Sequence, residues 1–313
     1  MIQRCTRCVT PLSRPGLKVD EYGICSACRW EEQKTKEALG MDIFFDDISL
    51  YGRDGNQYEC LVTVSGGKDS HYQTYIATEI LKLRTLTVTW ACCQTTPEGA
   101  ENLENLIQQF NVAHVMVRPA PRKYPEEMRC GLINDGDCCM PCHHGIFTEA
   151  SKIAKAYDIP IVLWGENPRK EYGGGAEVGE DKPAAFDGVT HLYVGDYLPW
   201  DARKQVELMR KYGFQDRNKP PHGAWLACEN VDCGFVGIHD YFAWLKFGMS
   251  RASIQLSIEI RKNRMTRDEA LRILDDIEPV ARPALEVKRF LEFSGMTMTE
   301  FETAEKLWKT TQE

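Results

Sequence analysis

A six-residue stretch, Ser65-Gly66-Gly67-Lys68-Asp69-Ser70, combines residue types that can hold a phosphate group. Its two glycines can take positive φ angles and let backbone N–H groups approach an anion without a Cβ in the way. The lysine adds a positive charge, and the serines add hydroxyl donors. Because an apolar run precedes the stretch and a helical pattern follows it, its amides are expected at a helix N-terminus, where the helix dipole favours negative charge. The sequence therefore predicts a phosphate-binding loop at residues 65–70.

The glycine spacing excludes two common nucleotide-binding loops. The Walker A pattern needs a second glycine well upstream of its Lys-Ser/Thr pair, and the dinucleotide fingerprint needs three spaced glycines. The stretch instead resembles the SGGKDS signature of the PP-loop ATP pyrophosphatases, which hold the pyrophosphate of ATP and transfer AMP to a substrate oxygen. The resemblance implies that residues 65–70 bind the β- and γ-phosphates. It also implies that Lys68 and Asp69 act in catalysis, with Asp69 helping to hold Mg²⁺, a cation that prefers carboxylate and phosphate oxygens.

Four cysteines near the N-terminus form two Cys-x-x-Cys pairs, Cys5/Cys8 and Cys25/Cys28. The prolines and glycines between the pairs favour tight turns, and the spacing is typical of four thiolates around a tetrahedral zinc ion. A closed four-cysteine site has no open coordination position, so we expect it to serve folding or docking rather than catalysis. The alternative is four free buried cysteines.

A second concentration of reactive side chains lies between Asn134 and His144, where three cysteines, two histidines and two carboxylates occur in eleven residues. Some PP-loop enzymes carry an iron–sulfur cluster on a Cys-x-x-Cys pair plus a distant cysteine, and this layout is similar. The sequence leaves two interpretations open. One is a second metal or cluster held by Cys139, Cys142, Cys228 and Cys233, and the other is a set of structural or substrate-lining thiols.

The elements that must position these residues follow an α/β pattern. From residue 58 onward, strand-like apolar runs at 59–64, 86–92, 113–118 and 159–164 alternate with helical patterns, as in a parallel sheet with helices on both faces. Ligands of such sheets bind at the carboxyl ends of the strands. We therefore expect Glu166 and Asn167, which follow the fourth run, at the same edge as the phosphate loop. The Gly- and charge-rich stretch 165–188, with Arg169 and Lys170, is interpreted as a lid over a charged substrate, and the alternative is a solvated loop.

Three parts are expected along the chain: a zinc module and linker at 1–45, the PP-loop ATP-binding domain at 46–235, and a helical C-terminal region at 236–313. The polar residues 42–57 are interpreted as the linker before the catalytic domain. The C-terminal region shows helical spacing at 238–247, 251–261, 266–277 and 283–293.

Composition limits the class of protein. The chain has 313 residues and a formal net charge of -8, which argues against a main surface that binds nucleic acid, because phosphate contacts need clustered Lys and Arg. No apolar run approaches the roughly 18 to 20 residues of a spanning helix. We expect a cytoplasmic protein without a membrane partner, whose thirteen cysteines are reduced or bind metal.

Longer motifs then occur in one order along the chain. After the zinc-knuckle opening and the phosphate loop come Pro141–Phe147, Trp164–Pro168, Glu171–Gly174, Gly195–Tyr197, Trp200-Asp201, Ile238–Tyr241 and Lys246–Gly248. Together they resemble the N-acetyl sugar amidotransferase family of surface-polysaccharide and nonulosonate biosynthesis, and the resemblance covers nearly the whole chain.

This resemblance implies conversion of an acetamido group on a nucleotide-linked sugar to an acetamidino group, with ATP consumed and AMP and pyrophosphate released. It suggests that Glu166 and Asn167 orient the amide or the ammonia. His143, His144, Arg169 and Lys170 are then expected to contact anionic parts of the nucleotide-sugar. The sequence contains no glutaminase motif, so the resemblance implies separate glutaminase and synthase-like subunits that supply ammonia.

Two alternatives remain open at this stage. A tRNA thiolase or related nucleotide-modifying PP-loop enzyme would also suit paired cysteines and a metal cluster, and co-purifying RNA would favour it. A zinc-nucleated scaffold that binds ATP without turnover is the second, and pyrophosphate release with a sugar substrate would exclude it.

Overall fold

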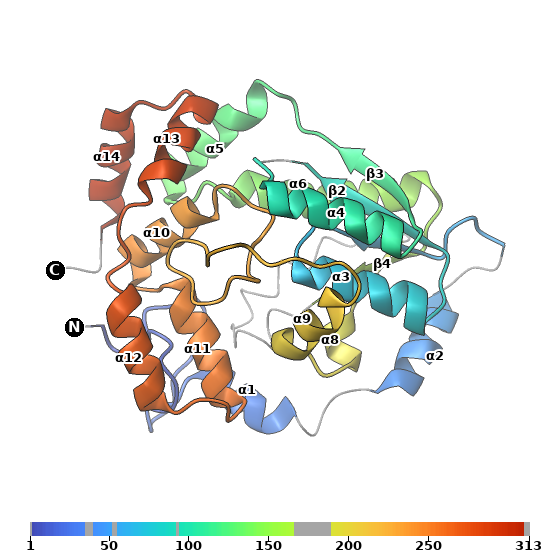
Figure 1. Ribbon diagram of the computed structural model, residues 1–313, viewed down its shortest axis with the longest axis horizontal. Coiled ribbons are helices and arrows are strands. Elements are labelled where there is room, and N and C mark those ends of the chain that lie inside the picture. The colour runs from blue at the N-terminus through green and yellow to red at the C-terminus, as the bar shows by residue number, and fades with distance from the viewer. Residues whose placement is uncertain (1, 35–39, 52–54, 92–93, 166–188, 310–313) are drawn as a thin grey trace.

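A computed structural model describes residues 2–34, 40–51, 55–91, 94–165 and 189–309 of the chain. Its centre is a five-stranded sheet with the strand order β3-β2-β1-β4-β5 (Figure 1). The strands are β1 (Cys60–Thr63), β2 (Thr85–Trp90), β3 (Ala113–Val117), β4 (Ile161–Trp164) and β5 (Thr190–Tyr193). Every neighbouring pair is parallel, which confirms the predicted α/β fold. The order reverses between β1 and β4, where open sheets of this class bind their ligands.

The central strand β1 is apolar because helices cover both faces of the sheet. Cys60 and Val62 point into one core cluster and Leu61 into another, as alternation along a strand requires. The first cluster is completed by helices α2, α4 and α9 and by the turn η1, and the second by α6. The phosphate loop that follows β1 is thus built on a strand that is buried on both sides.

The helices have the following bounds: α1 (Ser26–Lys34), α2 (Met41–Tyr51), α3 (Lys68–Tyr75), the π-helical turn η1 (Ile76–Ile80), α4 (Pro97–Gln109), α5 (Lys123–Asp135), α6 (Met140–Ala156), α8 (Val194–Tyr197), α9 (Ala202–Arg210), α10 (Val236–Phe247), α11 (Arg251–Arg261), α12 (Arg267–Ile277), α13 (Ala284–Ser294) and α14 (Met298–Trp308).

The predicted linker at residues 42–57 is wrong for most of its length, because helix α2 occupies it. Phe44 is fully buried in the sheet core, and its ring stacks on that of Tyr197 at a centroid distance of 4.3 Å. Ile48, one turn further, enters the same core. Two apolar residues four apart are enough to anchor a helix, and the three aspartates on its other faces made the segment look polar.

Helix α5 and strand β5 were not predicted. Helix α5 buries Tyr124, Met128 and Leu132 at intervals of four residues, a spacing that the sequence does contain. Helix α6 begins at Met140, so the Cys139/Cys142 pair lies at a helix N-terminus. Strand β5 is a short edge strand whose alternating pattern is too brief to stand out.

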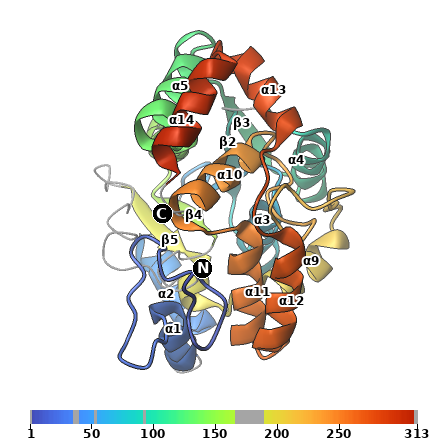
Figure 2. The ribbon, with the colours of Figure 1, turned by 90° about the vertical axis from the view of Figure 1, so that its left-hand side faces the viewer.

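The C-terminal helices pack in two groups. Helices α10, α13 and α14 share a core with α5 around Phe242, Phe290 and Phe301. Helices α11 and α12 pack on each other and hold the N-terminal module, which lies beside them in Figure 2. Val9 of that module is fully buried in their shared core, and the Thr10 hydroxyl donates a hydrogen bond to Ser257 Oγ at 2.9 Å.

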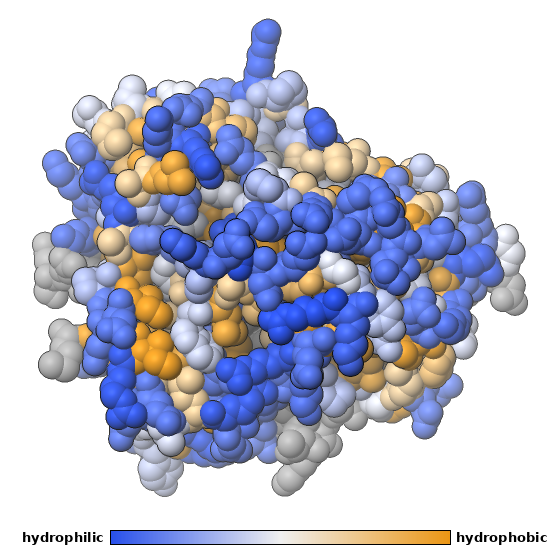
Figure 3. Space-filling model, viewed as in Figure 1, coloured by the Kyte–Doolittle hydropathy of each residue, from blue (hydrophilic) through white to orange (hydrophobic). Residues whose placement is uncertain are grey.

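The face of the molecule shown in Figure 3 is predominantly hydrophilic, with small separate apolar areas. Among the helices that the structure describes, none is both long and apolar enough to cross a membrane.

Candidate ATP site and metal centres

The phosphate loop has the predicted setting between a strand and a helix. It leaves β1 at the carboxyl edge of the sheet, and α3 begins at Lys68 with Gly67 as its N-cap. The Ser65 backbone N–H donates to Ser70 Oγ at 2.9 Å, and the two serine hydroxyls are 3.2 Å apart. These bonds close the loop on the first turn of α3, and the N–H groups of a helix's first turn are the donors that bind anions at helix N-termini.

The two glycines of the loop differ in backbone φ angle and in the space around their Cβ positions. Gly66 has a φ of +90°, and a Cβ on it would lie 2.1 Å from the carbonyl oxygen of Gly99 in α4. Gly67 has an ordinary φ of −77°, and a Cβ there would meet its nearest neighbour, Ser65 Oγ, at 3.5 Å. The fold therefore requires Gly66, whereas at Gly67 the fold leaves room for a side chain. That room suits the close approach of a ligand.

Lys68 is 6% exposed and lies between two carboxylates. Its Nζ is 2.6 Å from Asp69 Oδ2 and 3.4 Å from Glu229 Oε1. The other carboxylate oxygen of Asp69 is buried and has no hydrogen-bond partner among the residues that the structure describes. A buried acceptor without a donor is costly, and a cation at this position would satisfy it.

The segment between α9 and α10 brings Glu229 to the loop. It also brings Asp232, whose Oδ1 would be 3.6 Å from a Cβ on Gly67. The segment is fixed to the loop between β2 and α4 by two backbone hydrogen bonds, from Thr96 N to Asp232 O at 3.1 Å and from Gly234 N to Gln94 O at 2.8 Å. Sequence analysis missed both carboxylates, because nothing local connects residue 229 with residue 68.

Asp69, Glu229 and Asp232 place carboxylate oxygens, which Mg²⁺ prefers, beside a loop that fits phosphates, but these three side chains do not converge into one ligand group as the N-terminal cysteines do. The residues present thus fit the predicted ATP and Mg²⁺. They leave the metal to be completed by phosphate oxygens and water, as is usual for Mg²⁺ at nucleotide sites.

The four N-terminal cysteines converge as predicted. The sulfurs of Cys5, Cys8, Cys25 and Cys28 all lie within 4.8 Å of one another, and all four residues are buried. Backbone N–H groups of Arg7 and Cys25 donate to Cys5 Sγ at 3.4 and 3.3 Å, which is the environment of a thiolate. Hydrogen bonds from Cys25 and Cys28 lower the pKa of the Cys5 thiol to about 6. This donor set fits zinc.

The predicted second set of four cysteines is not brought together. Cys139, Cys142 and Cys233 pack against the core of α5, α10 and α13, whereas Cys228 packs against the sheet core near α9. The four sulfurs do not converge into a ligand group of the kind that the N-terminal cysteines form. Burial raises the pKa of the Cys228 thiol to about 11, so this side chain is a neutral thiol at physiological pH.

The expected substrate residues are only partly described. His143 and His144 are exposed on the first turns of α6, and His144 Nε2 is 3.5 Å from Thr148 Oγ1. Glu166, Asn167, Arg169 and Lys170, together with most of the predicted lid, lie outside the described residues. Gly165, the residue after β4, is described, and a Cβ on it would be 3.0 Å from the Trp200 ring.

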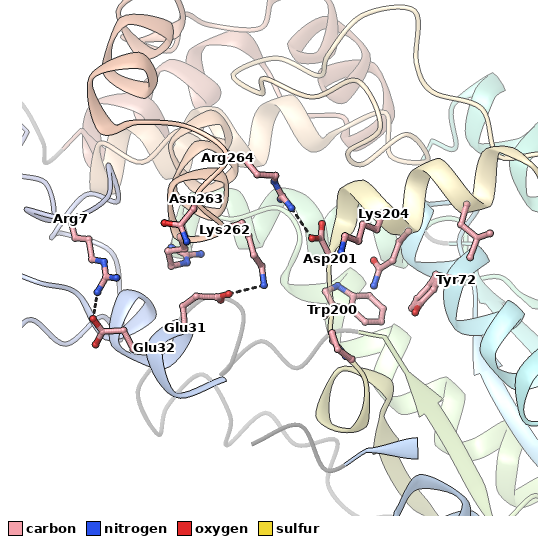
Figure 4. A pocket seen from close by; sticks show the side chains of 14 residues that line it. Arg7, Glu31, Glu32, Tyr72, Trp200, Asp201, Lys204, Lys262, Asn263 and Arg264 are labelled. Atoms are coloured by element: carbon pink, nitrogen blue, oxygen red, sulfur yellow. Dashed lines mark hydrogen bonds and ion pairs between the residues drawn. The ribbon is translucent and has the colours of Figure 1, made fainter. Parts of the chain in front are cut away.

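A cavity of about 740 Å³ opens between the N-terminal module, α9 and the turn from α11 to α12 (Figure 4). Its lining includes the side chains of Tyr72 and Trp200 and five cationic residues against three carboxylates: Arg7, Lys204, Arg261, Lys262 and Arg264 against Glu31, Glu32 and Asp201. Two ion pairs on its wall have the same length, Lys262 to Glu31 and Arg264 to Asp201 at 2.7 Å. The cavity therefore has a positive balance of charge. The Lys262–Glu31 pair ties the module to the turn after α11, and the Arg264–Asp201 pair ties that turn to the start of α9.

Comparison with known proteins finds a match in the C-terminal region. Residues 207–313 match the family described as LPS biosynthesis protein WbpG-like, C-terminal domain. The matched region holds Glu229 and Asp232, and it agrees with the predicted resemblance to a family of surface-polysaccharide biosynthesis.

Similar proteins are distant in sequence. The uncharacterized protein MJ1599 of Methanocaldococcus jannaschii is 19% identical over 230 residues, which are 71% of this chain and 74% of that protein. The structure of NMN synthetase from Francisella tularensis aligns with a TM-score of 0.37 and 12% identity, over 88% of this chain and 95% of that one. The U34-tRNA thiolase NcsA from Methanococcus maripaludis, solved with its [4Fe-4S] cluster, aligns with a TM-score of 0.38 and 15% identity, over 95% and 100% of the two chains.

Proposed function

We propose that this protein is an ATP-dependent amidotransferase that converts an acetamido group on a nucleotide-linked sugar to an acetamidino group. One observation carries the proposal. A loop suited to pyrophosphate, with Lys68 and a group of carboxylates, stands at the ligand-binding edge of a parallel sheet in a chain with a WbpG-like C-terminal domain. The phosphate loop supports ATP use, and the domain supports a sugar of surface polysaccharide as the substrate.

The chemistry suits ATP cleavage between the α- and β-phosphates. An amide carbonyl is a poor electrophile, and ammonia would have to expel oxide or hydroxide from it. Attack of the amide oxygen on the α-phosphate expels pyrophosphate and leaves AMP bonded to that oxygen. Ammonia then adds to the amide carbon, the C–O bond breaks, AMP leaves with the oxygen, and loss of a proton gives the neutral amidine. Neither step needs a covalent bond to the protein, so placement of charge is the main catalytic contribution.

Each part of the loop has a role in this scheme. The N–H groups of the first turn of α3 and the Lys68 ammonium group hold the departing pyrophosphate, whose charge grows as the bond breaks. Mg²⁺, held by Asp69 with Glu229 or Asp232, would neutralise phosphate charge. Because Lys68 is buried between carboxylates, its charge is fixed in place before the substrate arrives.

Recognition of the sugar is assigned to residues beyond the loop. Glu166 and Asn167 follow the carboxyl end of β4, next to β1, and are proposed to orient the amide or the incoming ammonia. Arg169, Lys170, His143 and His144 are proposed to contact the anionic part of the nucleotide-sugar. Ammonia is proposed to come from separate glutaminase and synthase-like subunits.

Mass spectrometry of the products tests the proposal. The purified chain is incubated with ATP, Mg²⁺, ammonium chloride and candidate UDP-diacetamido sugars, and replacement of oxygen by NH lowers the sugar mass by about one mass unit. Appearance of that product with equimolar AMP is the expected result, and Asp69→Ala serves as the inactive control. AMP formation that needs tRNA and leaves every sugar unchanged would favour the nucleotide-modifying alternative and overturn the proposal.

A further inference from the structure

We propose that Asp137, Cys139 and His239 form a second metal site, which binds one Zn²⁺ ion. One ligand atom from each of these side chains lies within 4.8 Å of the other two. Tetrahedral zinc ligands are about 3.3 to 3.8 Å apart when each is roughly 2.0 to 2.3 Å from the ion, so small side-chain rotations complete the site. The inference does not rest on the proposed function.

The three ligands come from one turn and one helix that pack against each other. Asp137 and Cys139 lie in the turn between α5 and α6, and His239 lies in the first turn of α10. Gly136 has a φ of +61°, which residues with a Cβ rarely adopt, and a Cβ at this position would lie 2.8 Å from the Trp308 ring. Both facts favour glycine in the turn. Lys246 of α10 donates a hydrogen bond to Asp135 O at 2.7 Å and fixes the helix against the end of α5.

The ligand side chains are held before any metal arrives. The backbone N–H of Cys139 donates to Asp137 Oδ1 at 2.8 Å, and His239 Nδ1 donates to the same oxygen at 3.1 Å. The residue after His239, Asp240, accepts two hydrogen bonds from the Arg251 guanidinium, at 2.6 and 2.7 Å, which ties this turn of α10 to α11. Such support around the ligands is what makes a metal site selective and tight.

The donor set selects the metal. A thiolate, an imidazole and a carboxylate match the borderline-soft preference of Zn²⁺, while Mg²⁺ and Ca²⁺ prefer oxygen ligands alone. An iron–sulfur cluster needs several thiolates, and of the three converging side chains only Cys139 supplies one. With Asp137 and Cys139 ionised and His239 neutral, the ligands balance the charge of Zn²⁺.

This site differs from the N-terminal one in its access to solvent. The side chains of His239 and Asp137 are 29% and 20% exposed, whereas the four N-terminal cysteines are buried. Three protein ligands with an open fourth position are typical of zinc sites that bind an exogenous ligand. Cys139 and Trp90, the last residue of β2, pack against the same core cluster, which places the proposed site near the carboxyl end of that strand.

Metal analysis of the full-length chain tests the site. Purified protein saturated with Zn²⁺ and then desalted should hold two zinc ions per chain, as measured by inductively coupled plasma mass spectrometry. His239→Ala and Asp137→Asn should each hold one ion. Cys130→Ser, which removes an exposed thiol on the neighbouring α5, is the matched control and should still hold two. Far-ultraviolet circular dichroism checks that each variant is folded.

Cobalt substitution separates the two sites by their spectra. Azide should change the visible spectrum of the Co²⁺ protein, because only a site with an open position can take it up, and His239→Ala should lose this change. A single zinc ion in the wild-type chain that survives in both His239→Ala and Asp137→Asn would overturn the proposal. So would an iron–sulfur absorbance band that depends on Cys142 and Cys233.

Discussion

Replacing Gly66 by alanine should destabilise the protein by about 2 to 5 kcal/mol. The backbone of Gly66 has a φ of +90°, which costs a residue with a Cβ about 1 to 2 kcal/mol. The new Cβ would also lie 2.1 Å from the carbonyl oxygen of Gly99. That oxygen belongs to the backbone of α4, so relief requires movement of a helix or of the loop, at about 1 to 3 kcal/mol.

Three other glycines separate these two costs. Gly295 has a φ of +67° and open space around its Cβ position, so Gly295→Ala should cost only about 1 kcal/mol. Gly99 has no positive φ, but a Cβ at this position would be 2.3 Å from Asp232 Cα. Gly99→Ala should therefore lower the free energy of unfolding by the steric cost alone, less the gain of about 1 kcal/mol from the higher helix propensity of alanine. Gly67 has neither problem, and Gly67→Ala should change stability by less than about 0.5 kcal/mol.

Urea denaturation followed by circular dichroism gives the four free energies of unfolding. Gly67→Ala should in addition lose AMP formation while keeping its stability, since its Cβ would occupy the space left for phosphate. Equal denaturation midpoints for Gly66→Ala and Gly67→Ala would refute the close approach of Gly66 to α4, and with it this account of the loop.

Three further predictions test the site and its support. Asp69→Ala should abolish release of AMP and pyrophosphate with an unchanged circular dichroism spectrum, and full turnover in that variant would remove Asp69 from the ATP site. Cys25→Ser, or removal of zinc by a chelator, should lower the melting temperature, because the module packs on α11 and α12, and an unchanged melting curve would contradict a structural zinc. His71 is fully buried, and burial lowers its pKa to about 4 from 6.5, while its Nδ1 is 3.2 Å from the Gly67 carbonyl oxygen. As the pH falls from 6.5 to 4, the His71 imidazole takes up a proton in the unfolded chain but not in the folded one. Its contribution should therefore lower the free energy of unfolding by up to about 3 kcal/mol over this range. His71→Gln should lose that part of the pH dependence, and an identical slope in both proteins would show that the buried imidazole is not its cause.

Local patterns in the sequence were sufficient to predict the loop at residues 65–70 between a strand and a helix, the convergence of the four N-terminal cysteines and the parallel sheet. Each rests on neighbours in the chain: Gly66 with its flanking strand and helix, cysteines spaced for one tetrahedral ion, and apolar runs alternating with helical patterns. Errors arose where the local signal was weak. Phe44, Ile48 and the partly buried Met41 anchor helix α2, but three aspartates lie between them in the sequence, and β5 is only four residues long.

The long-range pairings were decided only by the tertiary structure. The segment after α9 packs against the loop between β2 and α4 and so brings Glu229 to Lys68. Helix α10 packs against α5 and so brings His239 to Asp137 and Cys139. No local pattern encodes these contacts, because each joins residues about a hundred or more positions apart whose distance depends on how whole helices pack. The sequence alone therefore determined that a Gly-Gly-Lys loop joins a strand to a helix, and it predicted the convergence of four cysteines. Which carboxylates lie beside that loop, and which side chains form the proposed second metal site, followed from the packing of the C-terminal region.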